Sequence, residues 1–178
     1  MATSKFHKSF GCKLAAHQSG QAMLEFAIVA TLGLTLVFAL VDFGRALNYM
    51  QVMIGLSRQG SNLASRGDTL SAAAQAVIAG DAPLDLNNSG EVIVTAVTNA
   101  AAGNIVTGQV MQGHVTQGSK IGTAVGGPAS VPAAAAAMLQ PGQTIFITEV
   151  FYSFQPITPI GNFLNTVLPS TLYEAAFF

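Results

Sequence analysis

Charged residues are scarce in this chain. Only 8% of its 178 residues are Asp, Glu, Lys or Arg, whereas a soluble domain has about 25%. Apolar residues make up 51% of the sequence, and this composition argues against a freely soluble monomer. The length suits one ordinary domain with an accessory segment, because domains cluster near about 100–150 residues.

Cysteine and histidine are almost absent after residue 20. The single Cys12 lies before that point, so the rest of the chain can form no disulfide of its own. His7 and His17 also lie before it, which leaves His114 as the last histidine of the chain. One histidine without a second His or Cys does not build a zinc site, and we expect no metal or other cofactor.

Catalytic and nucleic-acid-binding motifs are missing as well. The sequence contains no Gly-x-Ser-x-Gly elbow, phosphate loop or dinucleotide fingerprint. The acids beyond residue 42 are scattered, at Asp68, Asp81, Asp85, Glu91, Glu149 and Glu174. The basic residues form no patch, which argues against a nucleic-acid partner. We therefore expect a protein that is not an enzyme.

The few charges are unevenly placed. Residues 1–20 contain three lysines and no acid, a charge of +3, whereas residues 21–178 contain four basic and eight acidic residues, a charge of −4. Lysines before an apolar segment, with none directly after it, place the N-terminus in the cytoplasm. Everything from Asp42 onward is then expected to lie outside the membrane.

The apolar segment is long enough to span a bilayer. The twenty residues from Ala22 to Val41 carry one charge, Glu25, and as a helix they span about 30 Å, the thickness of a hydrocarbon core. A carboxylate costs about 2.5–3.5 kcal/mol at the centre of a bilayer and less near its edge. Because Glu25 would lie about one turn inside the polar boundary of the bilayer, we expect its carboxylate to have a specific function.

Three interpretations of this segment remain open. A secretory signal peptide could be cleaved after Val37-Phe38-Ala39, but Glu25 and the long basic region fit this poorly. The helix could be an uncleaved anchor. We favour the third interpretation, cleavage after Gly20, which makes Gln21 the new N-terminus. The Glu25 carboxylate of one subunit could then pair with the Gln21 ammonium of a neighbour, and such pairing within apolar surroundings favours one register.

Residues around this point resemble a known family. Gly20 followed by Glu25-Phe26 and an apolar helix resembles the class III leader of type IV pilins and pseudopilins. The continuation to Asp42-Phe43-Gly44-Arg45 is similar to TadE-like pseudopilins of the tight-adherence (Tad/Flp) pilus system, as is the aromatic and proline-rich stretch 149–161. Flp major pilins usually have a Glu-Tyr pair and a very short mature chain, whereas this chain has Glu25-Phe26 and 158 residues after Gly20.

The resemblance implies a role as well as a fold. It implies a minor pilin-like subunit that acts in assembly or initiation of an adhesive pilus and is cleaved after Gly20 by a prepilin peptidase. The implied partners are that peptidase, other pilins and pseudopilins, and the inner-membrane assembly platform. The implied location is the bacterial inner membrane, crossed once, or the pilus after assembly. The alternative is an uncleaved envelope protein whose outer part binds an assembly partner or a surface ligand.

The helix is expected to continue past the membrane. A narrow apolar seam with 3-4 spacing follows it, at Ala46, Tyr49, Met53, Leu56, Gly60 and Leu63. Asp42 and Arg45 lie three residues apart on one helix face, where they could form an exposed ion pair or a contact with another subunit. We thus predict an α+β, pilin-like chain with three regions: a basic cytoplasmic leader at 1–20, a membrane-spanning and assembly helix at 21–66, and an extracytoplasmic α+β domain at 67–178.

The outer region is expected to hold a small, mostly antiparallel sheet packed on the seam. The predicted elements are a helix at 68–79 capped by Asp68 or Thr69, strands at 91–99, 104–112, 144–154 and 172–178, and an alanine helix at 132–139. The strand at 144–154 is apolar on both faces and should be internal. A turn is expected at 85–90, a mobile surface loop at 113–130, and a short helical turn between Pro156 and Pro169.

Overall fold

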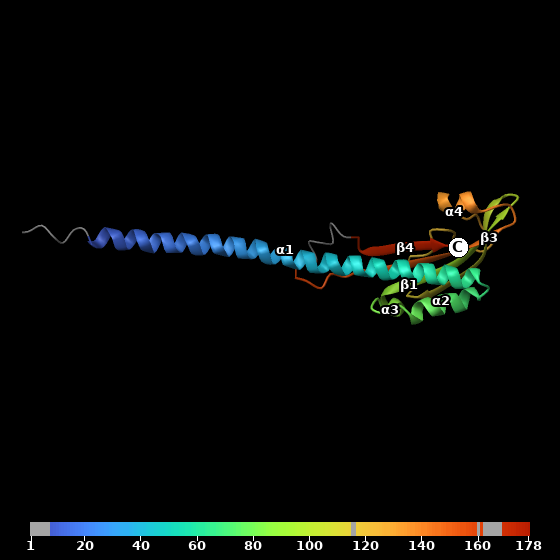
Figure 1. Cartoon of the computed structure of the whole chain (residues 1–178), viewed down its shortest axis with the longest axis horizontal. Helices are drawn as coiled ribbons and strands as arrows, with labels where there is room; N and C mark the ends of the chain where they lie inside the picture. The colour runs from blue at the N-terminus through green and yellow to red at the C-terminus, as the bar shows by residue number, and fades with distance from the viewer. Residues whose placement is uncertain (1–7, 115–116, 160, 162–168) are drawn as a thin grey trace, which may run out of the picture.

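A long helix and a small α+β unit make up the chain (Figure 1). The structure is a computed structural model that describes residues 8–114, 117–159, 161 and 169–178, with the backbone alone for 8–19. Lys5 and the rest of residues 1–7 therefore lie outside the described residues. Most of the expected helical turn between Pro156 and Pro169 does too.

Helix α1 runs from Lys8 to Ser65, so it begins within the predicted leader rather than at residue 21. The helix ends close to the predicted boundary, where Gly67 takes a φ of 103° and its N–H donates to the Ala64 carbonyl at 3.2 Å. Glycine adopts this left-handed conformation without steric cost, which is why it commonly follows a helix end. From Gly20 to Ser65 the helix is long and apolar enough to cross a membrane.

Four antiparallel strands form one sheet in the order β2-β1-β3-β4. The strands are β1 (Gly90–Ala100), β2 (Gly103–Gly113), β3 (Thr144–Ser153) and β4 (Thr171–Phe177). All four predicted strands are confirmed, and β3 is internal as expected. The alternation of β3 is confirmed too, because Phe146, Val150 and Tyr152 pack towards α1 while Ile145 and Ile147 pack on the other face.

Besides α1, the described residues form three short helices: α2 (Leu70–Ala79), α3 (Leu86–Ser89) and α4 (Ala133–Met138). The Thr69 hydroxyl caps α2 by accepting from the Ala72 N–H, so of the two predicted caps Thr69 is right. Helix α3 is a single turn where we expected turn chemistry. Pro132 occupies the cap position of α4, so the predicted alanine helix at 132–139 is confirmed with slightly shorter bounds.

The expected mobile loop is anchored where the structure describes it. Ile121 is only 3% exposed and packs with Val97 and Ile147 on the face of the sheet away from α1. Ser130 N–H donates to the Ile121 carbonyl at 2.6 Å, and Ala129 N–H donates to Asn104 at 2.8 Å. These contacts hold Ile121, Ala129 and Ser130 on the sheet, whereas residues 123–126 are exposed, as expected of a surface loop. We call residues 117–122 the strap.

The predicted apolar seam of α1 packs on the sheet. Met53 and Leu56 belong to the main core, while Tyr49 and Leu63 are partly buried against it. At Gly60 a Cβ atom would lie 2.7 Å from Thr148 Oγ1, so only glycine allows the helix to approach β3 this closely. The Ser61 hydroxyl next to it accepts from Thr148 N–H at 3.0 Å and reaches Ala176 O at 2.7 Å, which links α1 to β3 and β4.

Candidate functional site

The predicted cleavage site lies on an open stretch of α1. Gly20 and Gln21 are exposed, and a Cβ atom built on Gly20 would meet nothing within 4 Å. Nothing in the described part of the chain shields this peptide bond. The bond is nevertheless helical, and proteases need an extended substrate. A glycine lowers the cost of unwinding, because it stabilises a helix less than alanine does by about 1 kcal/mol.

Glu25 and Phe26 follow on the same exposed stretch. The Gln21 side-chain amide donates to Glu25 Oε1 at 3.3 Å, one helical turn away. Phe26 is 75% exposed. Among the described residues Glu25 has one weak partner, from its own helix, and a carboxylate can accept several more hydrogen bonds. Its remaining acceptor capacity is available to another group.

The four residues 42–45 do not behave alike. Asp42 is fully buried and Arg45 is partly buried, whereas Phe43 is 50% exposed. Gly44 is also exposed, with open space around it. This motif therefore has two sides, and among the described residues the polar contacts are made on the Asp42 and Arg45 side.

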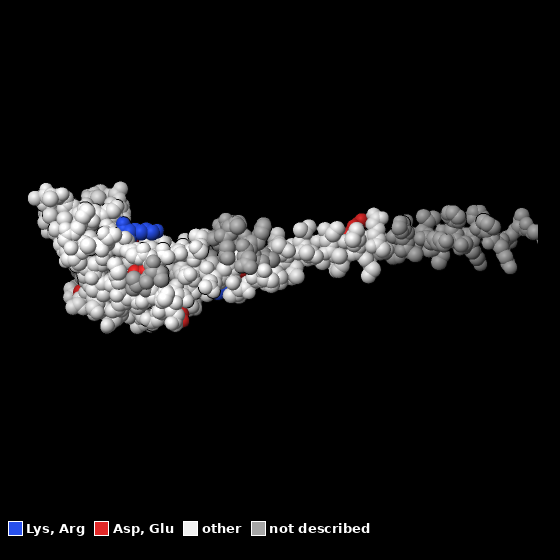
Figure 2. Space-filling view, turned by 180° about the vertical axis from the view of Figure 1, so that it is seen from behind, with Lys and Arg blue, Asp and Glu red and all other residues white. Residues whose placement is uncertain are grey.

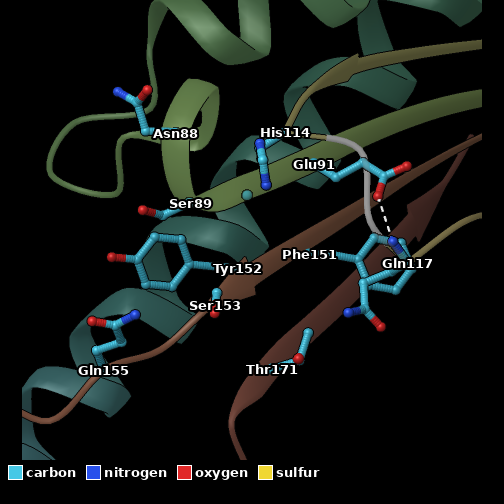
Figure 3. Close-up of a pocket in the computed structure, with 11 residues that line it drawn as sticks. Asn88, Ser89, Glu91, His114, Gln117, Phe151, Tyr152, Ser153, Gln155 and Thr171 are labelled. Atoms are coloured by element: carbon cyan, nitrogen blue, oxygen red, sulfur yellow. Dashed lines mark hydrogen bonds between the residues drawn. The ribbon is translucent and has the colours of Figure 1, made fainter.

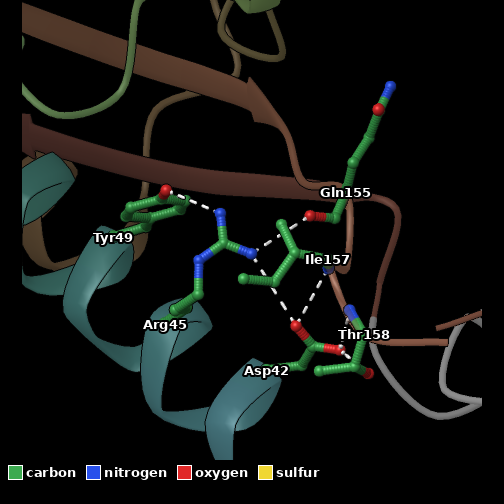
Figure 4. Close-up of polar contacts among 6 residues, drawn as sticks. All are labelled: Asp42, Arg45, Tyr49, Gln155, Ile157 and Thr158. Carbon is green, nitrogen blue, oxygen red and sulfur yellow. Dashed lines mark hydrogen bonds and ion pairs between the residues drawn. The ribbon is translucent and has the colours of Figure 1, made fainter. Parts of the chain in front are cut away.

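Asp42 holds the chain segment that follows β3 (Figure 4). Its carboxylate accepts from Ile157 N–H at 3.0 Å, from Thr158 N–H at 3.3 Å and from the Thr158 hydroxyl. Arg45 lies 3.7 Å from Asp42 and donates to the Gln155 carbonyl at 3.5 Å. We call this cluster, which also includes Tyr49, the polar latch. The predicted ion pair exists, but it is buried against residues 155–158, and sequence reasoning missed those partners.

Aromatic side chains support the latch from the sheet side. Arg45 donates to the Tyr49 hydroxyl at 2.9 Å and lies over the Tyr49 and Phe154 rings at 5.3 and 5.8 Å. Tyr49 in turn meets Tyr152 and Phe154 edge to face. The latch thus fixes the segment that follows β3 to α1, beginning one residue after the expected end of the membrane span.

A second buried carboxylate holds the strap. Glu149 lies at the middle of β3 with no exposed surface, and it accepts from Lys120 N–H at 2.9 Å, from the Ser119 hydroxyl and from the Tyr173 hydroxyl at 3.1 Å. Burial raises the pKa of Tyr173, and the charge of Glu149 raises it further. The Lys120 ammonium stands 3.6 Å from the centre of the Tyr173 ring. Sequence reasoning treated Glu149 as one of several scattered acids.

A small pocket opens at the end of the sheet where β1 begins and β3 ends (Figure 3). Its volume is about 290 Å³, and its lining includes Glu91, His114, Gln117, Tyr152 and Gln155. Gln117 N–H donates to Glu91 Oε2 at 3.0 Å. Within the described residues, no group of three or more His, Cys, Asp or Glu side chains could hold a metal ion.

These features define a class of protein: a chain with one N-terminal helix of membrane length that continues into a small α+β unit. The model of the TadE-like protein family matches residues 20–62, which confirms the resemblance seen in the sequence. The match begins at Gly20, includes Glu25 and the 42–45 motif, and ends near the end of α1. No curated protein and no solved structure shows significant similarity to the chain.

Proposed function

We propose that this chain is a minor pilin-like subunit of a Tad-type pilus, matured by a prepilin peptidase that cleaves between Gly20 and Gln21. The leader and its lysines stay in the cytoplasm, α1 crosses the inner membrane, and the α+β unit lies outside. After cleavage the helix assembles with other pilins or pseudopilins on the membrane platform. The observation that carries the proposal is the family match, which starts at Gly20 and runs along the helix.

Glu25 has a defined place in this scheme. Cleavage creates an ammonium group at Gln21, one helical turn before Glu25. Within one helix side chains lean towards the helix N-terminus, and the Gln21 side-chain amide already donates to Glu25 Oε1 at 3.3 Å. A neighbouring subunit shifted along the axis can instead bring its own amino end level with Glu25. This pairing offsets the cost of a carboxylate in lipid.

Replacing Gly20 with phenylalanine gives a clean test of cleavage. The open space around Gly20 means that the larger side chain disturbs no contact of the described residues. With a prepilin peptidase present, the natural chain should lose residues 1–20 by intact mass, and Gly20→Phe should keep them. Gly33→Phe is a matched control, because Gly33 also lies on open helix surface, and it should be processed normally. A natural chain that stays full length in its host would disprove the proposal.

One observation favours the alternative function, an uncleaved anchor whose outer part binds a ligand. The pocket beside His114 combines a carboxylate, an amide, an imidazole and two aromatic rings, which suits a polar ligand with an apolar face. This alternative predicts an unprocessed N-terminus and a ligand effect that is lost in His114→Ala. The mass measurement above separates the two candidates.

A further inference from the structure

The chain segment that follows β3 lies beside α1 at the point where the membrane span is expected to end. The N–H groups of Ile157 and Thr158 both donate to the carboxylate of Asp42. Asp42 is the first residue after the twenty-residue apolar stretch 22–41. Because hydrogen bonds of this kind hold donor and acceptor within about 3 Å of each other, Ile157 is fixed at the depth of Asp42.

This depth corresponds to the headgroup layer of a bilayer. The hydrocarbon core is about 30 Å thick, and the bilayer with its headgroups is about 40–45 Å thick, which leaves a headgroup layer of about 5–8 Å on each side. A helix crosses that layer in about four or five residues, and the stretch from Asp42 to Arg45 is of this length. Glu25 then lies about 26 Å from Asp42 along the axis, just inside the opposite edge of the hydrocarbon core.

Apolar side chains are exposed at this depth on both chain segments. Ile157 is 67% exposed and Phe43 is 50% exposed, and Pro159 is exposed as well. Asp42 has no exposed surface, because its carboxylate is enclosed by the N–H groups and the hydroxyl that it binds. The polar groups at this level therefore bind one another, while the apolar ones face outward. We call Phe43, Ile157 and Pro159 the collar.

Beyond the polar latch, the chain around the collar carries little charge. No charged residue occurs in the stretch 150–173, and none occurs along α1 at 46–57. Figure 2 shows almost no charge on the face of α1 in view between Glu25 and the α+β unit. A single exposed apolar side chain is common on any protein surface. Apolar residues at the edge of a membrane span, in a stretch without charge, instead have the composition of a surface that meets the headgroup boundary.

We propose that the collar rests in the headgroup layer of the outer leaflet, so that the lipid surface is a partner of the α+β unit as well as of the membrane helix. The inference rests on the proposed function, in which α1 crosses the membrane and the α+β unit lies outside. Lipid is the occupant because the latch ties Ile157 to the helix at the edge of the span, where headgroups surround α1. The contact also fixes how deep α1 sits, because the latch joins the collar to the helix.

Fluorescent labels on single cysteines test this contact in lipid vesicles. The full chain with Cys12→Ser, which has no other cysteine, is reconstituted in phosphatidylethanolamine and phosphatidylglycerol, with or without a lipid that carries a nitroxide quencher on its headgroup in both leaflets. A label at Ile157→Cys should lose as much fluorescence as one at Phe43→Cys, which reports the exit of the helix. Val125→Cys is the matched control and should keep its fluorescence. Val125 is also β-branched and is 61% exposed, but it lies beside the half of β2 nearest the β1–β2 turn, at the far end of the sheet.

Each outcome decides the matter. Quenching at Ile157→Cys and Phe43→Cys but not at Val125→Cys supports the proposal. Quenching at Phe43→Cys alone means that α1 crosses the membrane while the segment after β3 stands away from lipid, which overturns the proposal and leaves the proposed function intact. No quenching at Phe43→Cys overturns the membrane placement of α1 as well. Equal quenching at all three positions means that the label itself seeks lipid, and this also overturns the proposal. Pro159→Cys repeats the test if Ile157→Cys does not fold.

Discussion

Asp42 is the residue on which the attachment of the C-terminal half to α1 depends most directly. Asp42→Ala would leave the N–H groups of Ile157 and Thr158 without their acceptor, and a buried donor that loses its partner costs about 1–3 kcal/mol. Arg45 would also lose its buried counter-charge. We expect Asp42→Ala in detergent to unfold at a lower temperature than the natural chain, as measured by circular dichroism. Asp68→Ala removes an exposed acid and is the control; equal effects of the two changes would show that the latch contributes nothing.

The latch also shows what a sequence does not reveal about single residues. The i, i+3 spacing of Asp42 and Arg45 predicted their ion pair correctly, because helical spacing is a local property. The partners at 155–158 lie more than a hundred residues away along the chain, and no local pattern encodes that distance. Glu149 was hidden for the same reason: its donors Ser119 and Lys120 come from a distant glycine-rich loop without apolar periodicity, and its donor Tyr173 comes from β4.

At the scale of elements, local sequence signals were sufficient to predict helices and strands. Thr69 and Gly80 bracket α2 as cap and stop, and the valine-rich runs became β1 and β2. Helix α1 begins before the predicted start, at Lys8. Residues 8–21 contain no proline to interrupt the helix. The strap differed most from prediction, since its contacts are with the buried Glu149 carboxylate and with the sheet through Ile121, and both lie far from it in the sequence.

The strap therefore provides an element-scale prediction. Lys120 is the only Lys or Arg after residue 66, so trypsin cleavage there reports opening of the strap. Glu149→Gln removes the negative charge and replaces one acceptor oxygen with an NH2 group. Hydrogen bonds to charged groups contribute about 1.5–3 kcal/mol. We expect cleavage at Lys120 to become roughly tenfold faster.

Glu174→Gln gives the matched control for the strap. Glu174 lies on β4, the strand next to Glu149, and is half-buried, but none of its described hydrogen bonds reaches residues 117–122. Its cleavage rate should equal that of the natural chain. If Glu149→Gln is also cut at the natural rate, the strap is held by Ile121 packing and not by the carboxylate.

At the scale of the whole molecule, α1 joins a segment of membrane length to the α+β unit. The latch fixes the α+β unit to α1 directly after the membrane segment, and Gly60 and Ser61 fix it again near the far end of the helix. The unit and the helix should thus move as one body. A displacement of the helix along its axis would carry the outer part with it, as an assembling subunit requires.

The Glu25→Ala variant tests whether assembly depends on the amino end that cleavage creates at Gln21. Glu25→Ala removes a carboxylate that costs up to about 2.5–3.5 kcal/mol in lipid, so membrane insertion should be unchanged or better. Co-purification with the pilus assembly neighbours should be lost, because the Gln21 ammonium of an adjacent copy has no partner. Thr31→Ala is the control, since the Thr31 hydroxyl only donates to Ala27 within the same helix, and it should assemble normally.

A double variant separates pairing from a general effect of the charge. In Gly20→Phe the ammonium at Gln21 never forms, so adding Glu25→Ala to that variant should change co-purification no further. Such non-additivity is the signature of two groups that act on each other. If Glu25→Ala weakens assembly equally with and without cleavage, then Glu25 acts on something other than the new N-terminus. Normal assembly of Glu25→Ala alone would show that assembly does not need the Glu25 carboxylate.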